Sequence, residues 1–145
     1  MTIEVEALDG ISSEVAEAFR RLLPQLSSSA PPLDDEALER VIRSPSNTVL
    51  VARINGKIVG TLTLVRFPLP SGLRARIEDV VVDEAARGLG VGQALSRAAL
   101  QIAAESGART VDLTSRPSRD AANRLYQRLG FHLRNSHVYR LSLRE

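Results

Sequence analysis

Hydrophobic and polar residues follow two different periods along this chain, and each period predicts one kind of element. Apolar residues that alternate with polar ones, or gather in short runs, predict strands over residues 2–8, 48–54, 57–65, 73–82 and 109–114. Apolar residues at helical spacing predict four helices, over Ile11 to Leu26, Leu38 to Ile42, Val91 to Ile102 and Ala122 to Leu129. A strand, a turn and a second strand are expected over residues 131–143.

Polar and proline residues mark the expected ends of the helices. Asp34 or Asp35 is the expected cap of the second helix, and Ser118 or Asp120 that of the fourth, because short polar side chains accept hydrogen bonds from unpaired N–H groups. Pro24 is expected to bend or end the first helix.

Turn signals connect the elements and set their order. Asn55-Gly56 between two apolar runs predicts a tight hairpin, residues 68–72 predict another turn, and residues 27–32 a loop. The order β-α-α-β-β-β-α-β-α-β(β) predicts a mixed α+β fold, with a mostly antiparallel sheet and about four helices. One right-handed crossover over residues 77–114 would make two strands parallel. No linker interrupts the chain, so residues 1–145 are expected to form one domain.

The most informative stretch is the point where a strand turns directly into a helix. Ile77 to Val82 is β-branched and apolar apart from two acids, which is typical of a strand deep in a sheet. Arg87 follows, and the backbone is then bare of side chains at Gly88, Gly90 and Gly92. Unpaired N–H groups at a helix start bind anions, and the helix dipole strengthens the attraction. The pattern therefore predicts a pyrophosphate site.

Two motifs give this chain a resemblance to a known family. Arg87-Gly88-Leu89-Gly90-Val91-Gly92 resembles the acyl-CoA-binding signature of the GNAT superfamily of N-acetyltransferases, Gln/Arg-x-x-Gly-x-Gly/Ala, at every fixed position. Asn123 to Phe131 looks like the closing segment of that family, in which Asn and Tyr three residues apart precede Gly-Phe. The resemblance covers about residues 47–142, whereas residues 1–46 match in layout only.

The resemblance implies a GNAT-like fold and an acyl-CoA-dependent acyltransferase. Acetyl-CoA would be the cosubstrate, and a primary amine would attack it directly in a ternary complex. The two parallel strands would splay apart to admit pantetheine, whose amides would meet the backbone of Val80, Val81 and Val82. The pyrophosphate would meet Arg87, Gly88, Leu89, Gly90, Val91 and Gly92. Acceptor selection is implied for residues 24–36, 66–76 and 134–138. The identity of the acceptor does not follow from the sequence.

Glu78 is the candidate base. It lies among apolar strand residues, and burial would raise its pKa towards that of a useful base. In many relatives a Glu at this strand position acts as base through water, whereas a structural Glu78 would pair with Arg74 or Arg76. Asp79 is expected to face the other side of the strand, because strand side chains alternate, and to be structural.

Tyr126 and Asn123 are the candidates on the fourth helix. The family motif implies that the Tyr126 hydroxyl protonates the departing thiolate of CoA, whereas its place at the edge of an apolar stripe is also typical of a core tyrosine. Asn123 would bind the pantetheine arm or a water on the phosphate side, or lie on the helix surface. Arg116, Arg119 and Arg124 are candidates for the adenosine 3′-phosphate, although a solvated face is the simpler interpretation.

Composition narrows the remaining function classes. Lys and Arg number 19 against 17 Asp and Glu, and the net charge of +2 is too small to indicate a nucleic-acid partner. The chain has no Cys and two His, which removes disulfides and thiolate sites and predicts no metal. No membrane span or signal-peptide pattern is visible, so a cytoplasmic monomer or homodimer is expected.

Other site classes fit less well. A dinucleotide-binding turn needs Gly-x-Gly-x-x-Gly, and the glycines here are spaced differently. A Walker-type site needs Lys-Ser/Thr after its glycines, and a Ser hydrolase needs Gly-x-Ser-x-Gly, and both are missing from the sequence. Two alternatives stay open: an acyl-CoA-binding or regulatory module without catalysis, and transfer of an acyl group other than acetyl.

Overall fold

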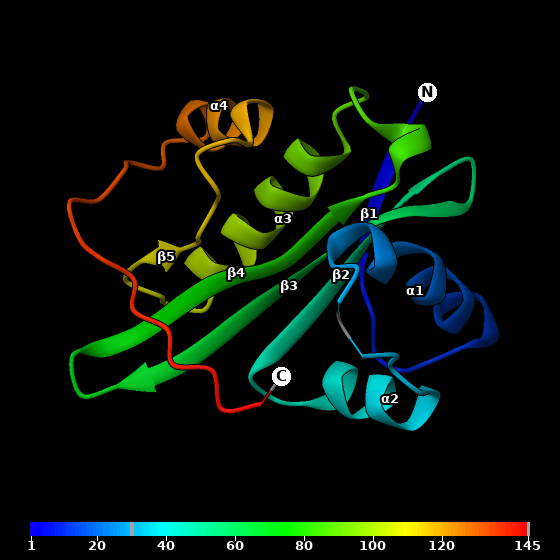
Figure 1. The fold of residues 1–145 in the computed structure, drawn as a ribbon, viewed down its shortest axis with the longest axis horizontal. Coiled ribbons are helices and arrows are strands. Elements are labelled where there is room, and N and C mark those ends of the chain that lie inside the picture. Colours follow the sequence, from blue (N-terminus) through cyan, green and yellow to red (C-terminus); the bar gives the residue numbers. More distant parts are fainter. Residues whose placement is uncertain (30, 145) are drawn as a thin grey trace. The chain divides into compact units, whose positions relative to one another are not determined.

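A five-stranded sheet in the order β1-β2-β3-β4-β5 forms the centre of the first 114 residues (Figure 1). The structure, a computed structural model, describes residues 1–29 and 31–144, and their contacts divide the chain after Thr114 into two compact units, each described here by itself. The first unit contains β1 (Ile3–Ala7), α1 (Ser13–Leu26), α2 (Asp35–Arg43), β2 (Asn47–Ile54), β3 (Lys57–Leu69), β4 (Gly72–Val82), the short 3-10 helix η1 (Glu84–Ala86), α3 (Val91–Glu105) and β5 (Val111–Asp112). The sheet is antiparallel except for the parallel pair β4–β5, as expected.

Local signals account for most of these boundaries. The Asn55-Gly56 hairpin forms as predicted, and both residues have positive φ, 52° and 78°, which a two-residue turn between twisted strands requires. Asp34 is the cap of α2, and its Oδ1 accepts from the Ala37 N–H over 2.7 Å. Pro24 lies in the last turn of α1, which continues for two more residues to Leu26. Ala30, in the predicted loop 27–32, lies outside the described residues.

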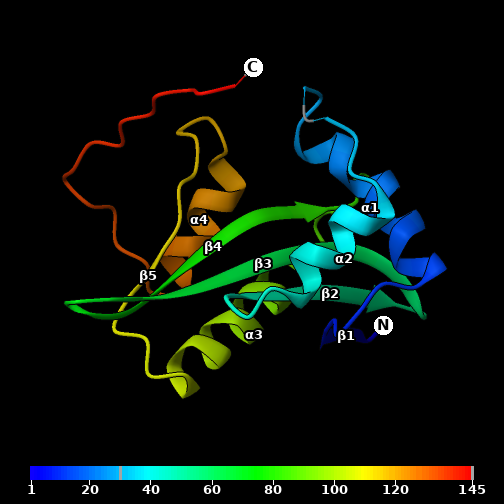
Figure 2. The same ribbon diagram turned by 90° about the horizontal axis from the view of Figure 1, so that it is seen from below.

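Helices cover both faces of the sheet. α1 and α2 lie on one face and α3 on the other (Figure 2). The face under α1 and α2 holds a continuous apolar core, built from Val15, Ala18, Phe19, Leu22, Leu38, Ile42, Val49, Val51, Ile58 and Val81. Fully burying one such side chain contributes roughly 1.5–3 kcal/mol, so this core fixes the position of α1 over the sheet.

The start of α3 lies very close to the sheet. A Cβ on Gly60 in β3 would be 2.9 Å from Val91 Cγ1 and 3.2 Å from the Val81 carbonyl oxygen. A side chain at this position would therefore push the first turn of α3 away from β4. Gly60 thus allows the first turn of α3 to lie close to β3 and to the end of β4.

Two predicted boundaries in the sheet were wrong. β3 continues through Pro68, which pairs with Leu73, so only residues 70 and 71 remain in the turn. The pairing between β2 and β3 ends at Val65. Beyond Val65, the described part of β3 pairs with β4 alone, and a proline is tolerated in such an edge segment. The predicted strand over residues 109–114 is reduced to the two residues of β5.

The second unit begins at Ser115 and contains α4 (Asp120–Arg128). Its cap is Arg119, without a side-chain hydrogen bond, so the prediction of Ser118 or Asp120 was wrong, and Asp120 is the first helical residue. The strand–turn–strand predicted over residues 131–143 is also absent from the described residues, where 131–144 form no strand. Alternation favours a strand only where a sheet edge supplies hydrogen bonds, and here Leu133 is 97% exposed.

Candidate active site at the end of β4

The final half of β4 has an open edge. β5 pairs with β4 only at Ala75 and Arg76, opposite Val111 and Asp112. From Ile77 to Val82, β4 has β3 on one side and, in the described part of the chain, no strand on the other. Backbone N–H and C=O groups along this edge are therefore available to an extended ligand, as in recognition by strand addition.

A bulge interrupts β4 at its two acids. Thr61 pairs with Val81 and Thr63 with Glu78, so Asp79 and Val80 together lie opposite one residue of β3. Asp79 has φ 51°, in the left-handed region that non-glycine residues rarely adopt. Asp79 was predicted to face the side of the strand opposite Glu78, because side chains alternate along a regular strand. The bulge interrupts that alternation at Asp79. Asp79 as a whole residue is exposed, but its carboxyl group is partly buried. This burial raises the pKa of Asp79, and the negative charge of Glu78 raises it further.

Glu78 is less buried than the sequence predicted. Its side chain is 43% exposed, and its Oε1 accepts from Arg76 Nη2 over 3.4 Å. One of the two expected arginine partners is therefore present, at a distance typical of a weak surface pair. The carboxylate remains accessible to water, which a base acting through a water molecule requires.

The turn after η1 is the segment in which the glycines predicted an anion site, and we call its residues 87–92 the cradle. Gly88 and Gly90 have φ of 79° and 93°, and nothing lies within 4 Å of a Cβ built on Gly88. Gly90 is the cap residue of α3, with no side-chain hydrogen bond and no acid in the first turn of the helix. The first backbone hydrogen bond of α3 runs from the Ala94 N–H to the Gly90 carbonyl oxygen, 3.0 Å. The N–H groups before Ala94 are thus available to a ligand.

Arg87 lies at the entrance to this cradle. Its side chain is 59% exposed, and its nearest acid, Glu84, is 4.0 Å from Nη1. A pair at that distance holds a guanidinium only weakly. Arg87 can therefore turn towards a phosphate without breaking a strong interaction.

Tyr126 and Asn123 belong to the second unit. Tyr126 is 8% exposed and packs edge-on against Phe131, with the ring centroids 5.8 Å apart. Burial raises the pKa of Tyr126, with Arg119 acting in the opposite direction, so the hydroxyl keeps its proton at neutral pH. The Asn123 amide donates to the carbonyl oxygens of Arg116 (3.0 Å) and Pro117 (3.4 Å) and holds the turn before α4. Arg116, Arg119 and Arg124 are all exposed.

The structure brings the predicted site residues of the first unit together along β4, η1 and α3, in the order Glu78, Val80 to Val82, and Arg87 to Gly92. Sequence reasoning missed the residues that hold this segment, namely Arg21 and Gln25 of α1 and Asp83 before η1. One signal was available, since Asp83 before Glu84-Ala85-Ala86 has the pattern of a helix cap.

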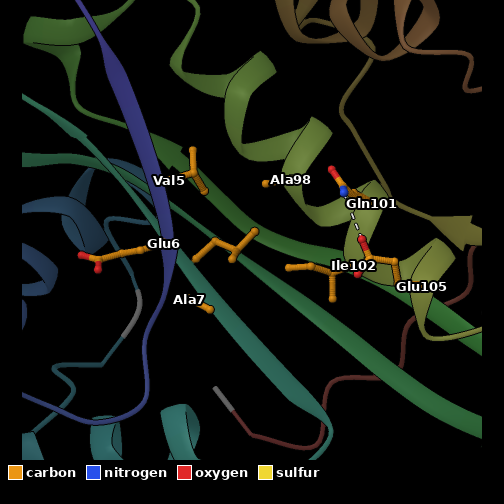
Figure 3. Close-up of a pocket in the computed structure, with 8 residues that line it drawn as sticks. Val5, Glu6, Ala7, Ala98, Gln101, Ile102 and Glu105 are labelled. Atoms are coloured by element: carbon orange, nitrogen blue, oxygen red, sulfur yellow. Dashed lines mark hydrogen bonds between the residues drawn. The ribbon is translucent and has the colours of Figure 1, made fainter.

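Described residues of the first unit line at least two cavities. One, of 240 Å³, lies between β1 and the second half of α3, where Gln101 donates to Glu105 over 3.0 Å (Figure 3). It holds no nucleophile and no pair of facing acids, and we assign it no chemistry. The other, of 260 Å³, lies between α1 and α2 under the connection that joins them, and Arg20 and Asp35 form an ion pair of 3.3 Å at its lining.

Two features are absent from the described residues. No helix among them is long and apolar enough to cross a membrane. Within the same residues, no group of three or more His, Asp or Glu side chains is arranged to hold a metal ion.

Comparison with known proteins shows which family and which solved structures this chain is similar to. The Acetyltransferase (GNAT) family matches residues 12–131. N-alpha-acetyltransferase RimI of Mycobacterium tuberculosis is 30% identical over 133 residues, covering 90% of this chain and 82% of that protein. An acetyltransferase of Trypanosoma brucei has a similar structure, with TM-score 0.81, 29% identity, and coverage of 98% of this chain and 100% of that one. A transcriptional regulator from Bacillus halodurans matches with TM-score 0.79 and 25% identity, covering 96% and 100% of the two chains.

Proposed function

This chain belongs to the Acetyltransferase (GNAT) family and is an N-acetyltransferase, and we propose that it transfers an acetyl group from acetyl-CoA to a primary amine by direct attack in a ternary complex. The observation that carries this proposal is the junction of β4 and α3. An open strand edge leads within ten residues into a helix start whose N–H groups no side chain caps. A pantetheine arm followed by a pyrophosphate has matching chemistry in the same order.

The cosubstrate is held mainly by the backbone in this proposal. Val80, Val81 and Val82 offer main-chain groups to the pantetheine amides, and residues 87–92 bind the pyrophosphate. Leu89 and Val91 contribute through their N–H groups, and Arg87 adds charge. Because α3 carries no acid in its first turn, no carboxylate competes with the phosphates there.

The nitrogen must lose two protons, one before and one after it bonds to carbon, and the departing sulfur must gain one. An alkyl ammonium has a pKa near ~10 and loses its proton first, and Glu78 accepts it through a water. The free amine nitrogen then forms a bond to the thioester carbonyl carbon, and the carbon–sulfur bond breaks with its electron pair on sulfur. The nitrogen, cationic once it has bonded to carbon, releases its second proton to water. Tyr126 protonates the thiolate, and its raised pKa keeps that proton in place until then. Asn123 supports the pantetheine arm, with its amide nitrogen already fixed by two carbonyl oxygens.

The part of this proposal with the least evidence from the sequence is the identity of the amine acceptor. The cavity between α1 and α2 is lined largely by apolar side chains, among them Phe19, Leu23 and Leu38. It is lined in part by residues of 24–36, the segment that the family resemblance associates with acceptor choice. The acids there are engaged locally, since Asp34 caps α2 and Asp35 pairs with Arg20. The amine is therefore selected by shape and apolar contact more than by these carboxylates.

The test is acetyl-CoA-dependent thiol release with a panel of amines, polyamines, aminoglycosides, amino acids and peptides. Acetyl-, propionyl- and succinyl-CoA are compared with the same acceptors. Release that requires both an amine and acetyl-CoA supports the proposal. A preference for a longer acyl group would replace acetyl in it, and CoA binding without release from any donor would contradict it.

Tyr126→Phe should lower turnover by about 10² or more while the affinity for CoA changes little, because one acidic hydroxyl is lost and the ring packed on Phe131 stays. Steady-state kinetics and calorimetry on the same sample measure both effects. Normal turnover in this variant would make Tyr126 a core residue.

Glu78→Gln should lose most activity at low pH, where the amine is almost wholly protonated, and recover part of it as pH rises and solvent takes the proton. The pH dependence of kcat/KM tests this expectation. A profile of unchanged shape with a lower melting temperature would assign Glu78 a structural role beside Arg76.

A further inference from the structure

A cluster of polar side chains ties α1 to the segment that leads into the cradle. Arg21 Nε donates to Asp83 Oδ2 over 3.2 Å, and Arg21 also donates to the carbonyl oxygen of Ile58 in β3. One turn along the helix, Gln25 Oε1 accepts from the Glu84 N–H over 2.9 Å. Two successive residues of the segment are thus held by two successive turns of α1.

The charges in this cluster are well shielded from water. The side chains of Arg21 and Asp83 are 25% and 12% exposed. Burial alone would raise the pKa of Asp83, but hydrogen bonds from the Ala85 N–H and from Arg21 hold it below its usual value. Glu17 accepts two further hydrogen bonds from Arg21, at 3.0 and 2.9 Å. A buried carboxylate with these partners is ordered, and removing its charge would leave the guanidinium partly unpaired.

Asp83 also determines how the chain leaves β4. Its N–H donates to the Val59 carbonyl oxygen over 2.8 Å, and its side chain caps η1 at Ala85. Arg87 follows η1 directly as its C-terminal cap, and Gly88 and Gly90 come next. The direction in which η1 leaves the strand therefore sets the position of the cradle.

We propose that Arg21, Gln25 and Asp83 are positioning residues that hold the cradle in its phosphate-binding geometry, and we call them the α1–η1 clasp. This inference rests on the proposed function, because it takes residues 87–92 to be the pyrophosphate site. The clasp touches no part of the cosubstrate. It acts by keeping η1 and the helix start in one place, so that their N–H groups are already aligned when CoA arrives.

The experiment compares two charge-removing variants of similar kind. Asp83→Asn keeps an oxygen for the Ala85 N–H but removes the charge facing Arg21. Glu14→Gln is the control: Glu14 accepts two hydrogen bonds from Arg53, at 2.7 and 2.9 Å, and neither residue belongs to the cradle or to the clasp. Both variants are expected to lower the melting temperature. Only Asp83→Asn should weaken CoA binding, by roughly fivefold or more in calorimetry at a temperature where both are folded.

The kinetics should show the same division. In the thiol-release assay, Asp83→Asn should raise KM for acetyl-CoA and leave kcat at saturating acetyl-CoA unchanged, which a general loss of stability would not produce. Gln25→Met removes the hydrogen bond to the Glu84 N–H, together with the 3.3 Å hydrogen bond that Gln25 Nε2 donates to the Arg21 carbonyl oxygen within α1. It should weaken CoA binding by a smaller factor, about twofold to threefold. If Asp83→Asn does not fold, Gln25→Met decides alone.

The possible failures are distinguishable. Absence of CoA binding by the unaltered protein would overturn the proposed function and the clasp with it. Normal binding by the unaltered protein, with CoA affinity unchanged in the folded clasp variants or lowered equally in Glu14→Gln, would overturn the clasp alone.

Discussion

The helices α2 and α3 begin in opposite ways. α2 starts with Asp34, whose carboxylate accepts from the Ala37 N–H, and two more acids follow in its first turn. α3 starts with Gly90 in the left-handed conformation, with no side-chain cap and no acid nearby in the helix. α1 resembles α2, because Ser12 Oγ accepts from the Val15 N–H over 3.2 Å. Two of these three helices therefore carry a side-chain cap, and the third has none at the end where we propose that a phosphate group binds.

This difference distinguishes helix starts that stabilise the fold from the helix start that we propose binds a ligand. A side-chain cap typically contributes ~1 kcal/mol to folding, and α3 has none. The start of α3 is instead held from outside, by Gly60 beneath it and by the α1–η1 clasp before it. The predictions below test this contrast, from the largest expected effect to the smallest.

Gly90→Asp should abolish CoA binding, with a loss of roughly 100-fold or more, because it places a carboxylate where a pyrophosphate must lie. Gly107→Asp is the matched control, since Gly107 also has positive φ, 82°, with nothing within 4 Å of a Cβ, but follows the other end of α3. Calorimetry with CoA compares the two. Unchanged binding in a folded Gly90→Asp protein would disprove the cradle.

Asp34→Ala should destabilise the protein by ~1 kcal/mol and leave CoA affinity unchanged, because it removes the acceptor for the Ala37 N–H at a helix that has a purely structural start. Urea unfolding gives the free energy and calorimetry gives the affinity. A loss of CoA affinity without a loss of stability would remove the distinction between the two helices.

Arg87→Ala should weaken CoA binding by only about threefold, and less at high salt, because an exposed guanidinium near a phosphate contributes modestly and is screened. Lys57→Ala, at the exposed hairpin after β2, controls for the change in net charge. Equal effects of the two substitutions would mean that Arg87 acts only through net charge.

Much of the first unit was predictable because its signals are local. Asn55-Gly56 specifies its own hairpin, and Asp34 and the glycines before α3 mark helix starts through the conformations and hydrogen bonds that these residue types allow. The uncapped start of α3 was predictable for the same reason, because bare N–H groups at a helix start depend on a few consecutive residues.

Several of the wrong predictions depend on partners that are distant in sequence. Residues 131–144 alternate like a strand, but alternation does not supply a sheet edge, and they form none in the described structure. The length of β5 depends on its pairing with β4, which extends only over Ala75 and Arg76. The bulge at Asp79 follows from the register between β3 and β4, which no single strand encodes.

By itself, the sequence determined the family resemblance, the order of most elements and the position of the cradle, because each rests on neighbouring residues. Only the tertiary structure decided that Glu78 is half-exposed beside Arg76, that Asp79 lies in a bulge, and that Arg21 reaches Asp83 across 62 positions of the chain. Burial and ion pairing are properties of the packed chain. Residues that act by holding a loop can therefore be identified only when the helix that holds it is in place.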